Sequence, residues 1–287
     1  MSLKSEYKTS LKSVEAEEIL DLIIFRPISF LIVKLIYNTN ITPNQVSIAA
    51  MLFGIVSGIF YSFSTYGFFI IAASCFFMCN TLDCVDGQLA RLKKNGTKIG
   101  RIVDGFIDYI SSFSIFFGIA LALSILTGDI IYSWLLTLAA GVSKAFQNMF
   151  FDHYRNMYLT YAYGKATDVN DEIKEFTDEK ERLMKEKGKI IEKLLVNIYL
   201  KYSIFQRNST RHIELNVSPE EYKKRNTLLL RMWSWIGSTT HMTLLIVFTV
   251  AYRIEWYLII TITLGNLLFL LIWLRQRMVL KELSRKG

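Results

Sequence analysis

Cysteine, proline and histidine are scarce in this chain, with three residues of each among 287. The cysteines Cys75, Cys79 and Cys84 lie in or beside one apolar segment, and an odd number gives no disulfide framework. We expect packed, reduced thiols, because a metal site would need further soft ligands that the neighbouring sequence does not supply. The first fifteen residues have no apolar core or small-residue cleavage site, so no cleavable signal peptide is visible and we expect a cytosolic N-terminus. The chain also shows no internal repeat and no low-complexity segment.

Apolar residues are abundant instead. They make up 52% of the chain, and the mean hydropathy is positive, which exceeds what one soluble core of this size needs. Several stretches approach or exceed the roughly 20 residues that cross a bilayer as a helix, and they lack the alternation of a β-barrel. The sequence therefore predicts an all-α integral membrane protein with about six transmembrane helices. We expect these spans at residues 43–63, 67–92, 99–126, 130–163, 228–252 and 255–274.

The net charge of +8 would raise the question of nucleic acid in a soluble protein. Here the basic residues gather at 4–12, 91–101 and 275–286, whereas the turns near residues 64–67 and 126–129 carry none. By the positive-inside rule, both termini face the cytosol, and the number of crossings is therefore even. We expect the membrane to be a prokaryotic inner membrane. The expected partners of this basic side are anionic headgroups or phosphorylated substrates, and not nucleic acid.

Four regions follow from these patterns. Residues 1–41 form a tail and an interfacial helix that breaks at Arg26-Pro27. Residues 42–164 carry the first four spans and begin with Thr42-Pro43-Asn44-Gln45, which is typical of a capped helix start. Residues 165–226 are too charged for the membrane and predict a helical cytosolic insertion, whose middle, 190–205, is typical of an amphipathic helix on a bilayer surface. Residues 227–287 hold the last two spans and a basic tail.

The segment from 83 to 108 carries the predicted chemistry. Helical spacing places one group on a single face, and a second group four residues apart on the next helix. The first group is Asp83, Asp86, Gly87, Ala90 and Arg91, and the second is Gly100, Asp104 and Asp108. The short basic turn between them makes the helices antiparallel neighbours, so four carboxylates meet near the cytosolic boundary. Unpaired, they would be too repulsive; Mg²⁺ or Mn²⁺, expected as two ions, are the natural partners.

This segment resembles the signature of the CDP-alcohol phosphotransferases, Asp-x2-Asp-Gly-x2-Ala-Arg-x8-Gly-x3-Asp-x3-Asp, at every defined position. The resemblance implies that Asp83, Asp86, Asp104 and Asp108 hold the metals and that Asp108 is the general base. It also implies that the donor's CDP lies among Asp83, Gly87, Ala90, Arg91 and Gly100. Attack by an alcohol on the phosphate of a CDP-linked donor would then release CMP.

The acceptor alcohol is less determined by the sequence. We expect CDP-diacylglycerol as donor, and inositol phosphate, inositol or glycerol phosphate as acceptor. The cations Lys144, Arg155 and Arg231 are candidates for binding a phosphate on the acceptor. Gly54 and Gly58 permit close helix contact, either within one chain or in a homodimer.

Alternative functions stay open at this stage. A soluble CDP-alcohol could instead deliver its headgroup to a lipid hydroxyl. A cation-coupled transporter would use intramembrane carboxylates, but it predicts broken helices and an inverted repeat that are not found here. A polyprenyl-chain enzyme with aspartate-bound magnesium usually has a DDxxD cluster, and Asp83-x2-Asp86 lacks the adjacent aspartate.

Overall fold

A computed structural model describes residues 3–11, 13–94, 98–164, 169–186, 188–209 and 215–284. The side chains of 98–105 are outside this description. The described residues form helices and no strand, which confirms the predicted all-α class. In chain order, the elements are α1 (Leu3–Ser10), the π-helical η1 (Asp21–Phe25), α2 (Arg26–Ile36), α3 (Pro43–Ser62), α4 (Tyr66–Lys93), α5 (Lys98–Thr127), α6 (Ile130–Tyr163), α7 (Val169–Lys185), α8 (Ile190–Ser209), α9 (Pro219–Trp233), the 3-10 turn η2 (Ser234–Ile236), α10 (Ser238–Val250), α11 (Ile254–Ile260), the π-helical η3 (Thr261–Gly265) and α12 (Asn266–Ser284).

Four helical segments among the described residues are long and apolar enough to cross a membrane. They are Pro43–Ser62, Tyr66–Lys93, Phe106–Thr127 and Ile254–Ser284. The predicted span at 228–252 is not one helix, because the chain turns at η2 and α10 has only 13 residues, about 20 Å of helix. A total of six crossings stays a prediction.

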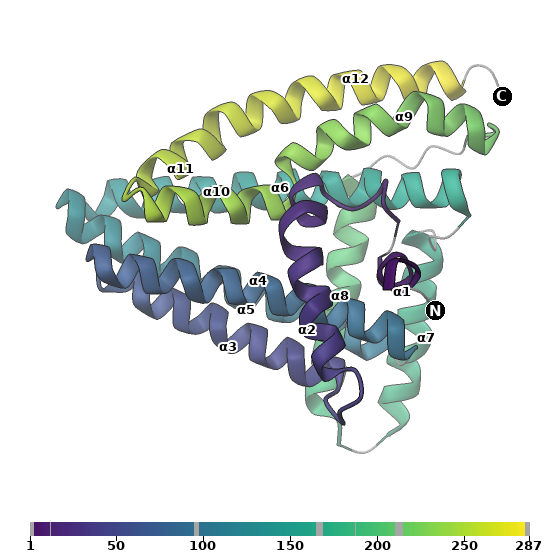
Figure 1. Cartoon of the computed structure of the whole chain (residues 1–287). Helices are drawn as coiled ribbons and strands as arrows, with labels where there is room; N and C mark the ends of the chain where they lie inside the picture. The colour runs from purple at the N-terminus through teal and green to yellow at the C-terminus, as the bar shows by residue number, and fades with distance from the viewer. Residues whose placement is uncertain are drawn as a thin grey trace.

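Helices α3, α4 and α5 form the closely packed half of the bundle (Figure 1). Gly54 and Gly58 of α3 allow this helix to pack closely against α5. A Cβ atom at Gly54 would collide with the Ser111 side chain of α5, and one at Gly58 with the backbone of Ser114. These glycines therefore serve contact within the chain, and they do not supply a homodimer contact.

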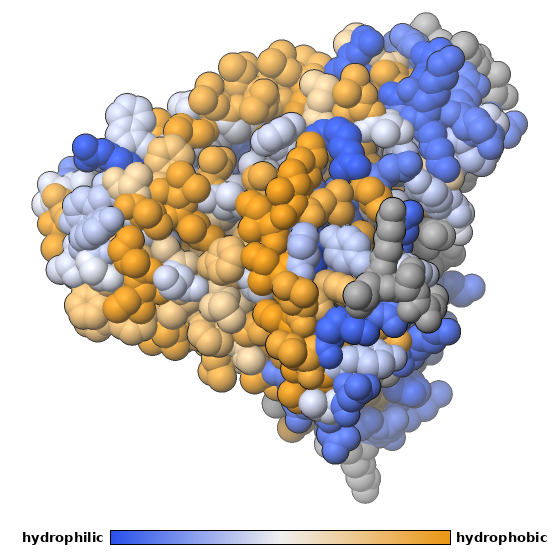
Figure 2. All heavy atoms as spheres, in the orientation of Figure 1, coloured by the Kyte–Doolittle hydropathy of each residue, from blue (hydrophilic) through white to orange (hydrophobic). Residues whose placement is uncertain are grey.

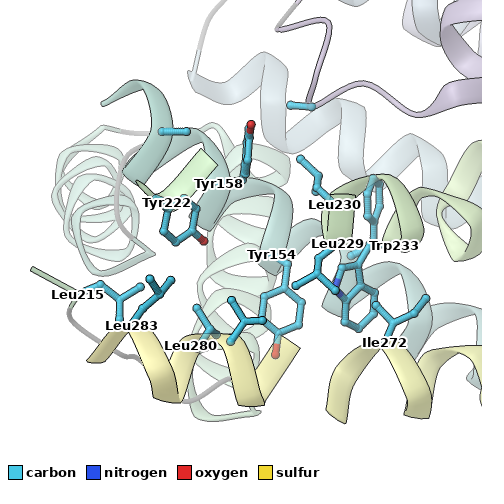
Figure 3. Close-up of a cluster of buried hydrophobic side chains, with 14 of the residues drawn as sticks. Tyr154, Tyr158, Leu215, Tyr222, Leu229, Leu230, Trp233, Ile272, Leu280 and Leu283 are labelled. Atoms are coloured by element: carbon cyan, nitrogen blue, oxygen red, sulfur yellow. The ribbon is translucent and has the colours of Figure 1, made fainter. Parts of the chain in front are cut away.

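A second cluster joins α6, α9 and α12 (Figure 3). Tyr154 of α6 and Trp233 of α9 pack with ring centroids 4.9 Å apart, and Trp233 Nε1 donates to Gln276 of α12. Burying large aromatic rings is the main stabilising term in such a cluster. It holds the C-terminal half of α6, which carries Arg155, against α9, which carries Arg231.

The predicted interfacial helix is α2 with the preceding η1. It runs crosswise to α3, α4 and α5 in Figure 1. Apolar side chains cover its outer face in Figure 2, where Leu31 and Leu35 are 67% and 80% exposed. The opposite face packs on α4 through Val33, Val85 and Leu89. A helix that packs one apolar face on the protein and exposes another apolar face is typical of a helix that lies in a membrane interface.

Candidate active site

Asp86 of α4 faces the start of α3. Thr42 and Gln45 form the predicted capping box at that start, so the first turn of α3 has a defined position. One turn later, Ser47 donates its hydroxyl to Asp86 Oδ2 at 2.5 Å, and Asp86 is buried. Sequence reasoning missed Ser47, whose only signal was its place shortly after the capped start of the first span.

Asp83 and Asp108 come from different helices and approach the same place. Both carboxylates lie close enough to the Cys79 thiol of α4 for their charges to act on it. Asp108 is exposed on α5. Asp83 of α4 and Asp108 of α5 thus lie near the same thiol, although within the described residues α4 and α5 pack mainly on α3 and not, as predicted, on each other. The side chains of Asp104 and Gly100 lie outside the described residues.

Lys144 lies on a third helix, α6, and is close to the same group. The charge of Asp108 acts on its buried ammonium, and its Nζ lies 5.5 Å from the centre of the Phe116 ring. The predicted general base and one predicted acceptor cation are therefore neighbours. An ammonium beside Asp108 favours the charged carboxylate that a general base needs.

The carboxylates are chemically suited to a divalent metal, because oxygen donors are what Mg²⁺ and Mn²⁺ prefer. Within the described side chains, no three His, Cys, Asp or Glu residues are grouped as a metal site. Since the predicted set needs Asp104, whose side chain is outside the description, the metal stays a prediction. The three cysteines are free thiols.

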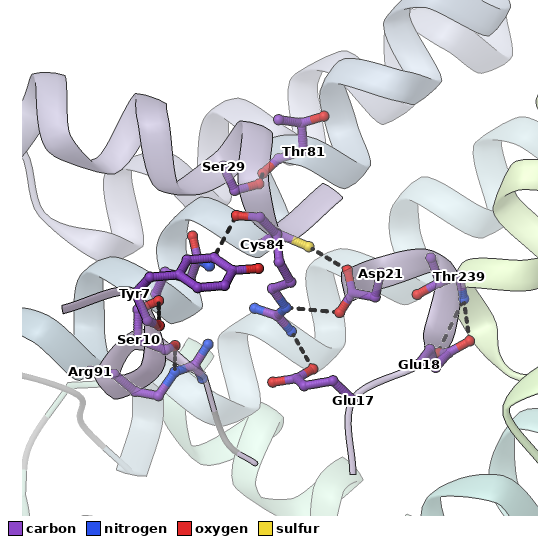
Figure 4. A network of polar contacts seen from close by, with 12 residues as sticks. Tyr7, Ser10, Glu17, Glu18, Asp21, Ser29, Thr81, Cys84, Arg91 and Thr239 are labelled. Carbon is purple, nitrogen blue, oxygen red and sulfur yellow. Dashed lines mark hydrogen bonds and ion pairs between the residues drawn. The ribbon is translucent and has the colours of Figure 1, made fainter. Parts of the chain in front are cut away.

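Gly87 and Arg91 form one unit on α4. A Cβ atom at Gly87 would lie 3.4 Å from the Arg91 guanidinium, which is ordinary van der Waals contact, so the two residues are direct neighbours on one face of α4. Arg91 donates through Nε to the carbonyl oxygen of Ser10 at the end of α1, while its Nη2 is buried and has no hydrogen-bond partner among the described residues (Figure 4). A buried guanidinium nitrogen without a partner is suited to an anionic ligand such as a phosphate. Ala90 is half-buried on the same helix.

The N-terminal segment is tied to α4 by a buried polar network that the sequence did not reveal (Figure 4). Arg26 pairs with Asp21 at 2.8 Å and with Glu17 at 3.0 Å. On the side of α4, Cys84 donates its thiol to Asp21, and Gln88 donates to the Arg26 carbonyl oxygen. The only signal was a run of acidic residues just before Arg26-Pro27. This network fixes α2 across the motif helix.

Arg155 and Arg231, the other two predicted acceptor cations, differ in their partners. Arg155 pairs with Asp152 at 2.8 Å and lies over the Phe151 ring, but its buried Nε makes no hydrogen bond among the described residues. Arg231 gives both terminal nitrogens to carbonyl oxygens of the N-terminal segment, at Val14 and Glu17. Arg231 therefore holds that segment, whereas Arg155 keeps a donor for another ligand.

An all-α integral membrane protein with this carboxylate motif at the meeting of three helices matches one known family. Residues 40–167 match the family model described as CDP-alcohol phosphatidyltransferase. A curated relative, archaetidylinositol phosphate synthase from Pyrococcus horikoshii, is 35% identical over 92 residues. The aligned residues are 31% of this chain and 45% of the relative, so the chain spans less than half the length of that relative.

Proposed function

We propose that this protein transfers a substituted phosphate from a CDP-linked lipid donor to an alcohol and releases CMP. The observation that carries the proposal is the family match over 40–167, together with the approach of Asp83, Asp108 and Lys144 from three helices. We take CDP-diacylglycerol or an equivalent CDP-linked lipid as the donor. Delivery of a headgroup from a soluble CDP-alcohol to a lipid hydroxyl is the alternative.

The residues act in the transfer through position and charge. Asp108 takes the proton of the attacking hydroxyl, and Lys144 lies close enough to that carboxylate for the two charges to interact. Arg91 offers to the donor's phosphates its Nη2, which has no hydrogen-bond partner among the described residues. Mg²⁺ or Mn²⁺, held by Asp83, Asp86, Asp104 and Asp108, would neutralise the charge that develops on the leaving CMP.

We propose an acceptor that itself carries a phosphate, with inositol phosphate as the first choice. The name of the relative, archaetidylinositol phosphate synthase, says that this protein makes archaetidylinositol phosphate. In this chain, Lys144 and Arg155 lie eleven residues apart on α6, about three turns, so they share one face. Two cations on one face leading from Asp108 would orient an anionic acceptor.

The proposal is tested by CMP release from purified protein in defined detergent. CDP-diacylglycerol and Mg²⁺ are supplied with inositol phosphate, glycerol phosphate or free inositol, and a parallel reaction contains EDTA followed by excess Mg²⁺. We expect release with a phosphorylated acceptor, loss with EDTA and recovery with Mg²⁺. A second arm supplies CDP-choline and diacylglycerol, which would identify the alternative direction. No CMP from any pair would reject the proposed enzyme and favour a transporter.

Arg155→Ala is expected to raise the acceptor KM by about tenfold or more, the scale of one charge-assisted hydrogen bond, while the donor KM stays unchanged. The physical reason is that Arg155 contacts only the acceptor phosphate. Steady-state kinetics with each substrate varied separately measure both constants. Arg277→Ala is the control, since Arg277 is another cation over an aromatic ring, at Trp273 of α12. A preference for free inositol, or equal acceptor KM values in Arg155→Ala and wild type, would show that Arg155 has no such contact.

The proposed topology puts the active site and both termini in the cytosol, as the lysine and arginine asymmetry supports. Asn40 and Thr65 are exposed residues at opposite ends of α3. A cysteine at Thr65 should react with an impermeant maleimide on intact cells, and one at Asn40 only after permeabilisation. The reverse labelling would place the site on the side without cytosolic CDP donors.

A further inference from the structure

Helix α8 has two apolar faces, and the protein covers only one of them. Leu195, Val196 and Leu200 pack against α7 in a small core with Phe176 and Leu183. A second stripe lies on the opposite side of the helix, at Ile190, Leu194, Ile198 and Phe205. These side chains are 78%, 56%, 42% and 53% exposed. Four large apolar residues on one exposed helical face mark an interaction surface.

The position of α8 indicates what this stripe faces. In Figure 1, α8 runs crosswise to the candidate spans, as α2 does, and α7 lies beyond it, farther from the middle of those spans. Tyr202 of α8 and Tyr109 of α5 contact edge to face, with ring centroids 6.1 Å apart. Tyr109 directly follows Asp108, the last charged residue of α5, so α8 is held at the level where the uncharged part of α5 begins. A face opposite to α7 at this level is directed toward the bilayer.

The charges of the two helices support the same orientation. The sequence of α8 has Lys193, Lys201 and Arg207 against one acid, Glu192. In contrast, α7 carries six acidic and four basic residues (VNDEIKEFTDEKERLMK). An anionic leaflet attracts the basic helix and repels the acidic one. Lys201 lies within the apolar stripe, where its long stem can cross the apolar layer and leave the ammonium among headgroups.

We propose that α8 is a membrane-surface helix: the stripe of Ile190, Leu194, Ile198 and Phe205 lies at the boundary of headgroups and acyl chains in the cytosolic leaflet. The occupant of this surface is thus an anionic lipid bilayer. The α7–α8 hairpin then rests on the membrane beside α5, just as α2 does beside α4. This inference uses the topology above but does not depend on the proposed chemistry.

Depth-dependent quenching tests the inference in the full-length protein. Leu194→Trp and Ile198→Trp each add an indole to the stripe, and Met184→Trp is the matched control, because Met184 is 67% exposed on α7. The proteins are reconstituted in vesicles of phosphatidylglycerol with or without bromine on the acyl chains. We expect the added fluorescence of Leu194→Trp and Ile198→Trp to be quenched by brominated lipid, and that of Met184→Trp to persist. Equal quenching at all three positions, or none at 194 and 198, would overturn the proposal.

A second measurement keeps the test independent of the tryptophan variants. Leu194→Glu combined with Ile198→Glu should make the hairpin about tenfold more sensitive to trypsin in phosphatidylglycerol vesicles, because charge is expelled from the boundary layer. Met184→Glu should leave the cleavage rate unchanged. A third variant, Leu194→Cys, tests the other occupant. If two Leu194→Cys chains formed a disulfide crosslink, and the tryptophan variants showed no quenching by brominated lipid, the stripe would contact a second copy of the chain and the membrane would be rejected as its occupant.

Discussion

CMP release should fall at least about 100-fold in Asp108→Asn, the scale of losing a general base, and by a similar factor in Asp83→Asn, Asp86→Asn and Asp104→Asn. An asparagine keeps the size of the side chain but removes its charge. At Asp108 it also removes the acceptor for the hydroxyl proton. The purified variants are compared by initial rates of CMP release at saturating CDP-diacylglycerol and acceptor.

Asp129→Asn is the control for these four variants. Asp129 caps the N-terminus of α6 by accepting from the Tyr132 backbone nitrogen, and asparagine caps helices about as well as aspartate. It lies at the opposite end of α6 from Arg155, so its rate should match wild type. Apparent melting temperatures close to wild type would confirm that the slow variants are folded. Near-normal CMP release in any two of the four would reject the proposed site.

Those features that depend on local periodicity could be predicted from the sequence. Helical spacing alone placed Asp83, Asp86, Gly87 and Arg91 on one face, and the capping tetrad gave the start of α3. Such features need only the next turn of the same helix or the length of a short connection. The sequence predicted that Asp108 and Asp83 approach each other because α4 and α5 are direct neighbours, whereas in the structure both helices pack on α3, which lies in contact with each of them.

Partners that are distant in the chain could not be predicted in this way. Arg231 is the clearest example, since its charge near the cytosolic boundary suggested a phosphate, whereas its donors go to Val14 and Glu17, more than 200 residues earlier. Likewise, the apolar content of 228–252 suggested one span. The chain instead turns at η2, because the buried side of α9 packs on α6 and α12.

The network around Arg26 also joins residues that are distant in the chain, and we expect its loss to have a large effect on stability. Arg26→Gln is expected to destabilise the protein by about 3–5 kcal/mol, since it leaves two buried carboxylates without their cation. Side-chain exposure is 11% at Arg26, 7% at Asp21 and 4% at Glu17, so water cannot replace the lost partner. Although burial opposes the charge on Arg26, the neighbouring carboxylates raise its pKa, and the wild-type guanidinium stays protonated.

Lys34→Gln is the matched control, because it removes a cation from the same helix at an exposed pair. Lys34 and Glu6 are 2.7 Å apart and 39% and 28% exposed, and such pairs contribute at most about 1 kcal/mol. Unfolding in detergent can be followed with a thiol-reactive dye, because Cys84, which donates to Asp21, is buried in the folded protein. Arg26→Gln should react at a lower temperature than wild type, and Asp21→Asn added to it should recover part of the loss. If Arg26→Gln and Lys34→Gln melted together, the ion pairs of Arg26 would contribute no more than a surface pair. The attachment of α2 to the motif helix would then come from the apolar contacts of Val33, Val85 and Leu89 and from hydrogen bonds that do not use the Arg26 side chain.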